Sequence, residues 1–165
     1  MGKNNQAELE REFIRIIQEN ERIIYKICSF YTSELSPIED LYQEVVLNLW
    51  KAYPKFRRES RVSTWIYRVA LNTCISDLRK ESKRRREIPL SLSEEIVFEP
   101  DSMEADIKEL YRLIYRLKTL ERAMILLWLE DKSYQEIADI TGLTLSNVAT
   151  KLKRIKEKLK TMSNQ

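Results

Sequence analysis

The scarcity of turn-forming residues is the feature that most constrains how this chain can fold. Only 2 glycines and 4 prolines occur among 165 residues, while Leu, Ile, Glu, Lys and Arg are frequent. Such a composition favours helices, because the frequent residues have high helix propensity and few residues interrupt them. No stretch alternates apolar and polar residues in the way that predicts a strand. The sequence therefore predicts an all-α protein.

Apolar residues at helical spacing predict three helices in the first half of the chain. Ser36, Pro37 and Glu39 mark the start of the second helix, because the serine can cap it, proline suits the first helical position and the glutamate completes a capping box. Pro54 ends that helix, and a short basic loop follows. The three helices form a first small domain, residues 1–86. The first helix covers about residues 7–31 and has a break near Asn20. The second covers about residues 37–53, and the third covers about residues 63–85.

Residues 87–105 lack helical periodicity and predict a flexible linker between two domains. The segment contains Pro89, Pro100 and several acidic residues. About 17 residues without regular structure extend up to about 60 Å. A linker of that length lets two domains bind DNA sites more than one helical turn apart.

The second domain, residues 106–165, has the pattern of a helix-turn-helix of the winged-helix-like class. Ser133 and Glu136 form another capping box, Ala138 allows two helices to cross closely, and Gly142 supplies the tight turn. Val148 anchors the last helix on the preceding one. The predicted helices begin near residue 106, cover about residues 120–130 and 133–140, and end with 144–160.

The last predicted helix carries a polar face suited to the DNA major groove. Asn pairs with adenine, Ser and Thr with several bases, and Lys or Arg with guanine or phosphate. Ala138, Gly142 and the Ser133 cap stand at the spacing that a helix-turn-helix requires. This spacing favours a DNA-binding helix over a plain amphipathic helix of a bundle. The candidate contacts are Ser146, Asn147, Thr150, Lys151, Arg154 and Lys158.

The layout of charge indicates a polyanionic partner, although the net charge is only +3. Residues 51–87 carry 12 basic and 4 acidic side chains, and residues 132–165 carry 7 and 3. The blocks 1–50 and 88–131 are acidic. Dense basic runs of this kind favour a phosphate backbone as partner over an ordinary solvated helix face.

Several function classes find no support among the residues. The chain has no His, the commonest general base and metal ligand, and we expect no catalytic residue, metal site or cofactor. Cys28 and Cys74 lie singly in apolar helical patterns, which predicts reduced core thiols. No signal peptide is recognisable, and the longest apolar run is far shorter than the ~20 residues that span a bilayer. We expect a cytoplasmic protein that is not an enzyme and does not insert into the membrane.

Two blocks of the sequence closely resemble the sigma factors of bacterial RNA polymerase. Asp-Leu-Tyr-Gln-Glu-Val-Val at 40–46, Phe-Arg at 56–57 and Thr-Trp-Ile-Tyr-Arg-Val-Ala-Leu-Asn-Thr at 64–73 resemble region 2. Residues 117–120, Ser-Tyr-Gln-Glu-Ile-Ala at 133–138 and Gly142 resemble region 4. One short linker joins the regions, which is the layout of the extracytoplasmic-function group. The resemblance covers about residues 10–160.

The resemblance implies a subunit that binds core RNA polymerase and directs initiation at promoters through their −10 and −35 elements. In the family, the region 2.2 helix docks on the clamp helices of the largest polymerase subunit, and region 4 meets the flap of the second-largest subunit. It further implies a monomer when free and an anti-sigma factor that can hold the chain at the inner membrane, away from the nucleoid. The implied polymerase-binding residues are Asp40, Gln43, Glu44 and Asn48.

In the family, the next helix and its preceding loop read and melt the −10 element. Asn72 matches the position that helps to capture an extruded non-template base. Trp65 and Tyr67 match the aromatic motif, for which base stacking and a core position are both open interpretations. The implied −10 contacts are Arg57, Arg58, Arg61, Trp65, Tyr67, Arg68, Asn72 and Arg79.

Three positions depart from the family pattern. Arg58-Glu59 stands where many members have Gly-Asp, so the loop loses a small flexible residue and its shape is left open. Ala149 stands where Lys or Arg is usual, so the −35 preference need not follow that of the family. Ile155 stands where Ala is common, and it can extend the core.

Two other function classes stay open from the sequence alone. A helix-turn-helix regulator of the ordinary kind is dimeric and binds operators without polymerase. An adaptor that imitates a sigma factor lacks promoter specificity even with polymerase. Binding to core polymerase separates the first class from the sigma factor, and promoter specificity separates the second.

Overall fold

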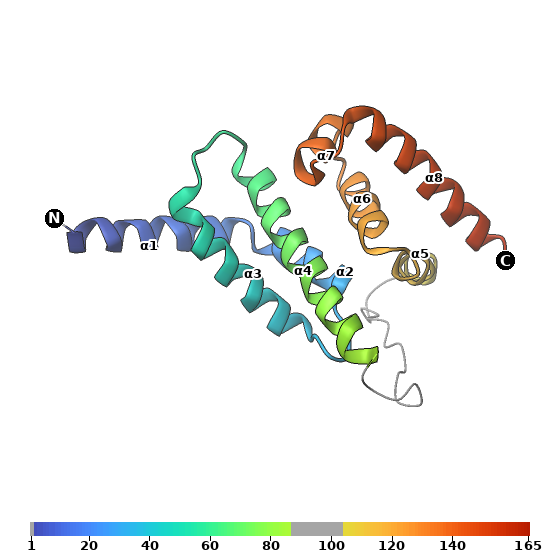
Figure 1. Ribbon diagram of the computed structural model, residues 1–165, viewed down its shortest axis with the longest axis horizontal. Coiled ribbons are helices and arrows are strands. Elements are labelled where there is room, and N and C mark those ends of the chain that lie inside the picture. The colour runs from blue at the N-terminus through green and yellow to red at the C-terminus, as the bar shows by residue number, and fades with distance from the viewer. Residues whose placement is uncertain (1, 87–103) are drawn as a thin grey trace.

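The protein is described here by a computed structural model that covers residues 2–86 and 104–165 (Figure 1). Within these residues the regular elements are eight α-helices and one 3-10 turn, without a strand, which confirms the all-α prediction. None of these helices combines the length and the apolar character needed to cross a bilayer. The predicted linker falls largely on residues 87–103, outside the described residues.

The first helix of the prediction is two helices, α1 (Gly2–Glu19) and α2 (Glu21–Tyr31). The break lies at Asn20, as predicted, and the Asn20 side-chain amide donates to the carbonyl of Ile16 at 2.8 Å. The same carbonyl also accepts the backbone amide of Asn20 at 3.2 Å, so both donors of Asn20 meet at the end of α1. α1 begins five residues earlier than predicted and projects from the rest of the first domain (Figure 1).

The prediction that Ser36 caps the helix after Pro37, which is α3 in the structure, is wrong. α3 (Ile38–Ala52) begins one residue after Pro37, and no side chain caps its first turn. The Ser36 hydroxyl instead donates to the carboxylate of Asp77 on α4. The Ser36 hydroxyl binds this carboxylate of α4 instead of capping a backbone amide of α3, because a hydrogen bond to a carboxylate is the stronger of the two.

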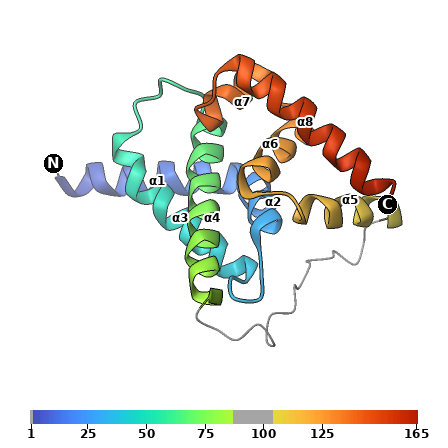
Figure 2. The same ribbon diagram turned by 45° about the vertical axis from the view of Figure 1, so that its right-hand side comes forward.

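α4 (Val62–Arg86) is the centre of the first domain and packs against both α2 and α3 (Figure 2). Its buried side includes Ile66 and Ala70, each fully buried, and these meet the buried faces of α2 and α3. A 3-10 turn, η1 (Tyr53–Lys55), ends α3, and the loop to α4 follows at residues 56–61. Burial of this apolar stripe, at about 25 cal/mol for each Å², drives the packing of the three helices.

The second domain consists of four helices, the last two of which form a helix-turn-helix. The Ser133 hydroxyl accepts a hydrogen bond from the Glu136 amide at 3.1 Å, and Thr144 caps the last helix in the same way through the Asn147 amide at 3.2 Å. Gly142 ends the preceding helix with φ of 78°, a left-handed conformation that suits glycine. The helices are α5 (Ala105–Tyr115), α6 (Thr119–Leu129), α7 (Tyr134–Thr141) and α8 (Leu145–Ser163).

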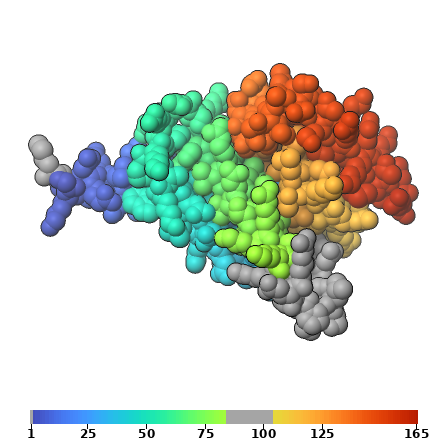
Figure 3. Space-filling model, viewed as in Figure 1, coloured from blue at the N-terminus to red at the C-terminus, as the bar shows by residue number. Residues whose placement is uncertain are grey.

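The two domains lie against one another, which the sequence did not predict. α7 contacts α4, and α6 contacts both α2 and α4. Figures 2 and 3 show the second domain, in yellow to red, resting on the green surface of α4. The described helices therefore form one continuous body rather than two separate bundles.

Candidate nucleic-acid and polymerase interfaces

α8 presents the predicted polar face to solvent. Its apolar stripe is buried against α6 and α7, so the residues between the apolar positions point away from the domain. Ile155 is 2% exposed, which confirms that it extends the core. Ala149 lies among the exposed positions. The exposed predicted contacts are Ser146, Asn147, Thr150, Lys151, Arg154 and Lys158.

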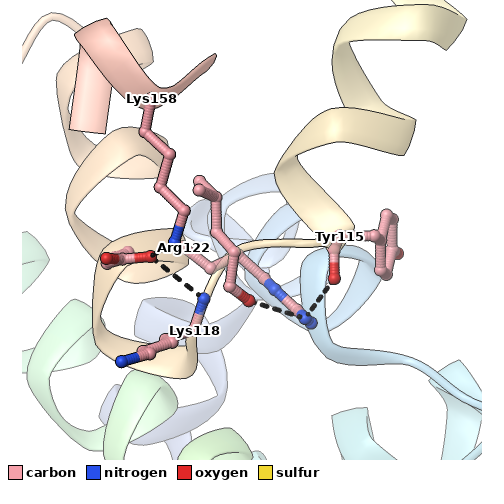
Figure 4. Close-up of polar contacts among 6 residues, drawn as sticks. Tyr115, Lys118, Arg122 and Lys158 are labelled. Atoms are coloured by element: carbon pink, nitrogen blue, oxygen red, sulfur yellow. Dashed lines mark hydrogen bonds and ion pairs between the residues drawn. The ribbon is translucent and has the colours of Figure 1, made fainter. Parts of the chain in front are cut away.

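Lys158, the last predicted residue of this face, also has a partner inside the domain. Its ammonium group lies 3.1 Å from a carboxylate oxygen of Glu121 on α6. In Figure 4 the Lys158 side chain extends toward the start of α6, where Lys118 lies. The same carboxylate accepts a hydrogen bond from the Lys118 amide at 3.2 Å. This partly exposed pair is worth little on its own, about 0–1 kcal/mol, so Lys158 can leave Glu121 at small cost.

α4 gathers Arg68, Asn72 and Arg79 on one exposed face, at positions i, i+4 and i+11. This face is opposite the stripe that contains Ile66 and Ala70. The sequence pattern predicted this division between a buried and an exposed side, and the structure confirms it.

A polar groove of about 440 Å³ runs beside Asn72, between α3 and α4. It brings together two sets of residues that the sequence assigned to different partners. Glu44 and Asn48 come from α3, and Asn72 comes from α4. The Asn48 amide donates to the Thr73 hydroxyl at 3.0 Å, so Asn48 joins the two helices and is only partly exposed. Of the other lining residues, Lys80 belongs to the basic block of residues 51–87. Val69, Thr73, Ser76 and Asp77 were not predicted as site residues.

A second hollow of about 270 Å³ lies between the loop at 56–61 and the start of α4. It unites Arg57, Trp65 and Arg68, all predicted contacts of the −10 element. Phe56 stacks on Trp65, with ring centroids 4.7 Å apart and planes 25° apart. Residues that the sequence missed here are Ala52, Lys55, Phe56, Glu59 and Ser60.

The loop at Arg58 keeps a backbone shape that favours glycine. Arg58 has φ of 55°, in the left-handed region that a side chain disfavours by about 1–2 kcal/mol. Its guanidinium pairs with the carboxylate of Glu12 on α1, and both groups are substantially exposed. The departure from the family pattern therefore changes the strain and charge of the loop.

The two predicted aromatic contacts have different environments. Trp65 is 7% exposed and packs inside the first domain on Phe56 and Tyr53, as a core residue. Tyr67 is 2% exposed, and its neighbours include Lys132 of the second domain, whose ammonium lies 5.1 Å from the ring centre. Burial, together with the nearby Glu130 and Glu136 carboxylates, raises the pKa of Tyr67 to about 12. Contacts across the domains therefore surround Tyr67 but not Trp65.

The predicted polymerase-binding surface is accompanied by an apolar groove. Asp40, Gln43 and Glu44 are exposed on α3. Beside them lies a groove of about 390 Å³ whose exposed lining is almost wholly apolar. A second helical stripe, Tyr42, Val46 and Trp50, was the sequence signal for it, one residue beyond the core stripe Leu41, Val45 and Leu49. The lining residues are Phe13, Tyr42, Gln43, Val46, Leu47 and Trp50.

Cys28 and Cys74 are buried thiols without a disulfide, as predicted. Their side chains are close enough to hydrogen-bond, and this contact together with burial raises the pKa of Cys74 well above its ordinary value. A thiol held neutral in this way is a poor nucleophile and metal ligand. Both residues therefore serve the packing of α2 against α4.

Comparison with known proteins gives the same two regions. Residues 16–84 match Sigma-70 region 2, and residues 107–159 match Sigma-70 region 4. The ECF RNA polymerase sigma factor SigG of Mycobacterium tuberculosis is 36% identical over 91 residues, which are 55% of this chain and only 24% of that relative. RNA polymerase sigma factor SigV of Bacillus subtilis is 29% identical over 147 residues, covering 86% of this chain and 84% of SigV. The ECF RNA polymerase sigma-E factor of Escherichia coli is 27% identical over 134 residues, which cover 73% of this chain and 70% of sigma-E.

Two solved structures share the fold. Sigma factor RpoE of Bartonella quintana, in complex with the anti-sigma factor NepR, superposes with a TM-score of 0.73 at 17% identity, over 95% of this chain and 97% of RpoE. CnrH, in complex with the cytosolic domain of CnrY, superposes with a TM-score of 0.64 at 19% identity. The match covers 94% of this chain and 89% of CnrH. From the two matched regions and these relatives together, the chain belongs to the sigma-70 family, within the extracytoplasmic-function group of RNA polymerase sigma factors.

Proposed function

We propose that this chain binds core RNA polymerase and directs initiation at promoters that it recognises through their −10 and −35 elements. The observation that carries the proposal is the exposed row Arg68, Asn72 and Arg79 on α4, beside two polar hollows. A basic row next to hollows of 270 and 440 Å³ suits a single strand whose bases leave the stack.

The −10 element is opened with binding energy alone in this proposal. Unstacking and unpairing a base costs a few kcal/mol. An extruded base held beside Asn72 offsets that cost, and Arg57, Arg61 and Arg79 hold the adjacent phosphates. The catalytic chemistry of RNA synthesis belongs to the polymerase.

The −35 element is read by α8 in the major groove. Ser146 and Asn147 lie in the first turn, where a recognition helix faces the base edges. Lys151 and Arg154 lie further along, at positions suited to phosphates. The Thr144 cap and the Gly142 turn hold this first turn in a fixed direction relative to α7.

Polymerase binding is assigned to α3, with Asp40, Gln43 and Glu44 beside the apolar groove. A polar edge next to an apolar surface suits a charged coiled coil such as the clamp helices. In the second domain, the exposed apolar side chains of Leu120, Trp128 and Leu129 are candidates for contact with the flap. The complex of RpoE with an anti-sigma factor supports a partner of that class here. We place the free chain in the cytoplasm as a monomer.

The first test is co-elution of the purified chain with bacterial core RNA polymerase on gel filtration. Glu44→Lys reverses an exposed charge on the docking helix, and Glu34→Lys makes the same change at an exposed position outside the helix. We expect co-elution of the original chain and of Glu34→Lys, and its loss in Glu44→Lys. A folded chain that does not bind polymerase from its own organism, but binds duplex DNA as a dimer, favours the operator-binding regulator instead.

A further inference from the structure

The first turn of α8 carries an apolar side chain on the surface of the protein. Leu145 opens the helix and is 50% exposed. Ala149, one turn later, is exposed as well. Side chains at positions i, i+3 and i+4 are neighbours on a helix, so Ala149 adjoins both Leu145 and Ser146. Leu145 and Ala149 therefore form an apolar strip along the edge of the polar face that the proposed function gives to DNA.

The same part of α8 carries no positive charge. Its first six residues, 145–150, are Leu-Ser-Asn-Val-Ala-Thr, and the first cation of the helix is Lys151. A recognition helix turns its N-terminal residues toward the base edges. The commonest specific contact there is an arginine or a lysine that pairs with guanine. The base-facing end of α8 therefore lacks the side chains that usually read guanine.

The side chains that are present fit an A·T pair instead. The Asn147 side chain is exposed, and an asparagine can pair with both N6 and N7 of adenine. Thymine is the base that presents a methyl group in the major groove, and an apolar side chain gains by covering it. Single exposed apolar residues are ordinary, but these two are adjacent and lie in the turns that face the groove.

We propose that α8 selects A·T pairs in the −35 element, with Leu145 and Ala149 covering thymine methyl groups and Asn147 pairing with a nearby adenine. This inference rests on the proposed function, which places α8 in the major groove. A lysine or an arginine at position 149 would pair with guanine, so Ala149 sets the base preference there. In Figure 1, α8 runs along the outer edge of the second domain, where a duplex can reach it.

The experiment begins with random duplexes, from which the full chain selects its own site. Repeated selection at low salt keeps the free chain bound, because phosphate contacts are strongest there. We expect the selected site to be dominated by A·T pairs. Each thymine of that site is then replaced in turn by uracil, which removes only the methyl group. Where the methyl is covered, fluorescence anisotropy should show binding weakened by about fourfold, the effect of one buried carbon group.

A matched pair of leucine variants assigns this effect to a side chain. Leu145→Ala should abolish the uracil effect at one thymine, because the shortened side chain no longer reaches the methyl. Leu35→Ala removes the same atoms from a leucine that is 43% exposed in the loop before α3, and it should keep the full uracil effect. An effect of uracil on the shape of the DNA would persist in both variants. Circular dichroism checks that both are folded.

Ala149→Lys tests the second residue of the strip. It should change the preferred base at one position from thymine to guanine, by about tenfold in the ratio of the two affinities. The ratio is the measurement, since the added charge strengthens binding to both duplexes.

The outcomes separate this inference from the proposed function. A selected site of G·C pairs, or one that binds equally well with uracil at every thymine, would overturn the inference and leave α8 as the reader of the −35 element. A uracil effect that is the same in Leu145→Ala and Leu35→Ala would overturn it too. If no sequence is enriched, recognition of a −35 element by α8 fails, and this inference fails with it.

Discussion

The two surfaces assigned to DNA differ in what determines their exposure. On α8, the polar face is opposite a buried stripe of the same helix, so it is exposed wherever the second domain lies. On α4, Arg68, Asn72 and Arg79 are also exposed. The Arg68 guanidinium, however, donates to the Asp139 carbonyl of the other domain, and the adjacent Tyr67 is buried beside Lys132 of that domain. Exposure of the first surface is a local property, and exposure of the second depends on the arrangement of the domains. Of the two surfaces, the one on α4 is therefore the one that adjoins the other domain.

Removing the support beneath α8 should give the largest effect. Leu152 is fully buried, and Leu152→Ala should lower the free energy of unfolding by about 3 kcal/mol through lost burial and the cavity left behind. Thr150→Ala on the exposed face of the same helix should change it by less than about 0.5 kcal/mol. Urea unfolding followed by circular dichroism measures both. Equal losses would contradict the division of α8 into a buried and a solvent-exposed side.

Asn72→Ala tests the exposed part of the α4 surface. The loss of base capture should slow promoter opening by about tenfold, the effect of about 1.4 kcal/mol on a barrier. Binding to core polymerase should stay unchanged. Permanganate reactivity of unpaired thymines, followed in time, measures the opening, and gel filtration checks the binding. Opening at the original rate would remove Asn72 from the −10 site.

A pair of arginine variants compares the surfaces directly. Arg154→Ala should weaken binding of the free chain to a −35 duplex and reduce the salt dependence of that binding by about one in slope. Arg68→Ala should leave this binding unchanged in the free chain, because its guanidinium is held by the Asp139 carbonyl. Fluorescence anisotropy over a series of salt concentrations measures both slopes. A slope unaltered by Arg154→Ala would rule out its phosphate contact.

Gly142→Ala tests the turn that aims α8. A Cβ at this position meets no atom within 4 Å, so only the backbone conformation opposes the change. With φ of 78°, the expected loss of stability is about 1 kcal/mol. Thermal unfolding measures it, and Gly2→Ala, at the exposed start of α1, serves as the control with little change expected. No loss at Gly142 would mean that the turn relaxes to another conformation.

Arg58→Gly should give the smallest effect, and it should raise the stability of the folded chain rather than lower it. Relief of the left-handed strain stabilises the folded chain, while the greater freedom of the unfolded chain and the lost Glu12 pair offset part of the gain. We expect a net gain of about 0.5 kcal/mol in thermal unfolding. Arg58→Ala loses the pair but keeps the strain, so it should not gain stability. A gain in both variants would assign the effect to charge.

Much of the fold could be predicted from single-helix patterns. The break at Asn20, the cap at Ser133 and the turn at Gly142 depend on residues within a few positions of one another, and all three were confirmed. The cap assigned to Ser36 was wrong, because its partner Asp77 is 41 positions away. The candidate site divides in the same way. Faces of α4 and α8 followed from periodicity, whereas the polar groove required two helices to be placed side by side.

The sequence by itself determined which residues can form helices, which side of each helix is apolar and which turn joins α7 to α8, since each of these follows from backbone sterics and from spacing along one helix. Only the tertiary structure decided that Trp65 is core, that Tyr67 is covered, and that Arg122 caps a helix of the other domain. Arg122 directly precedes the apolar run 123–129 of α6, and it is largely buried. The identity of its partners depended on the packing of the two domains, because the carbonyls at the end of α2 become acceptors for it only when that helix end lies against α6.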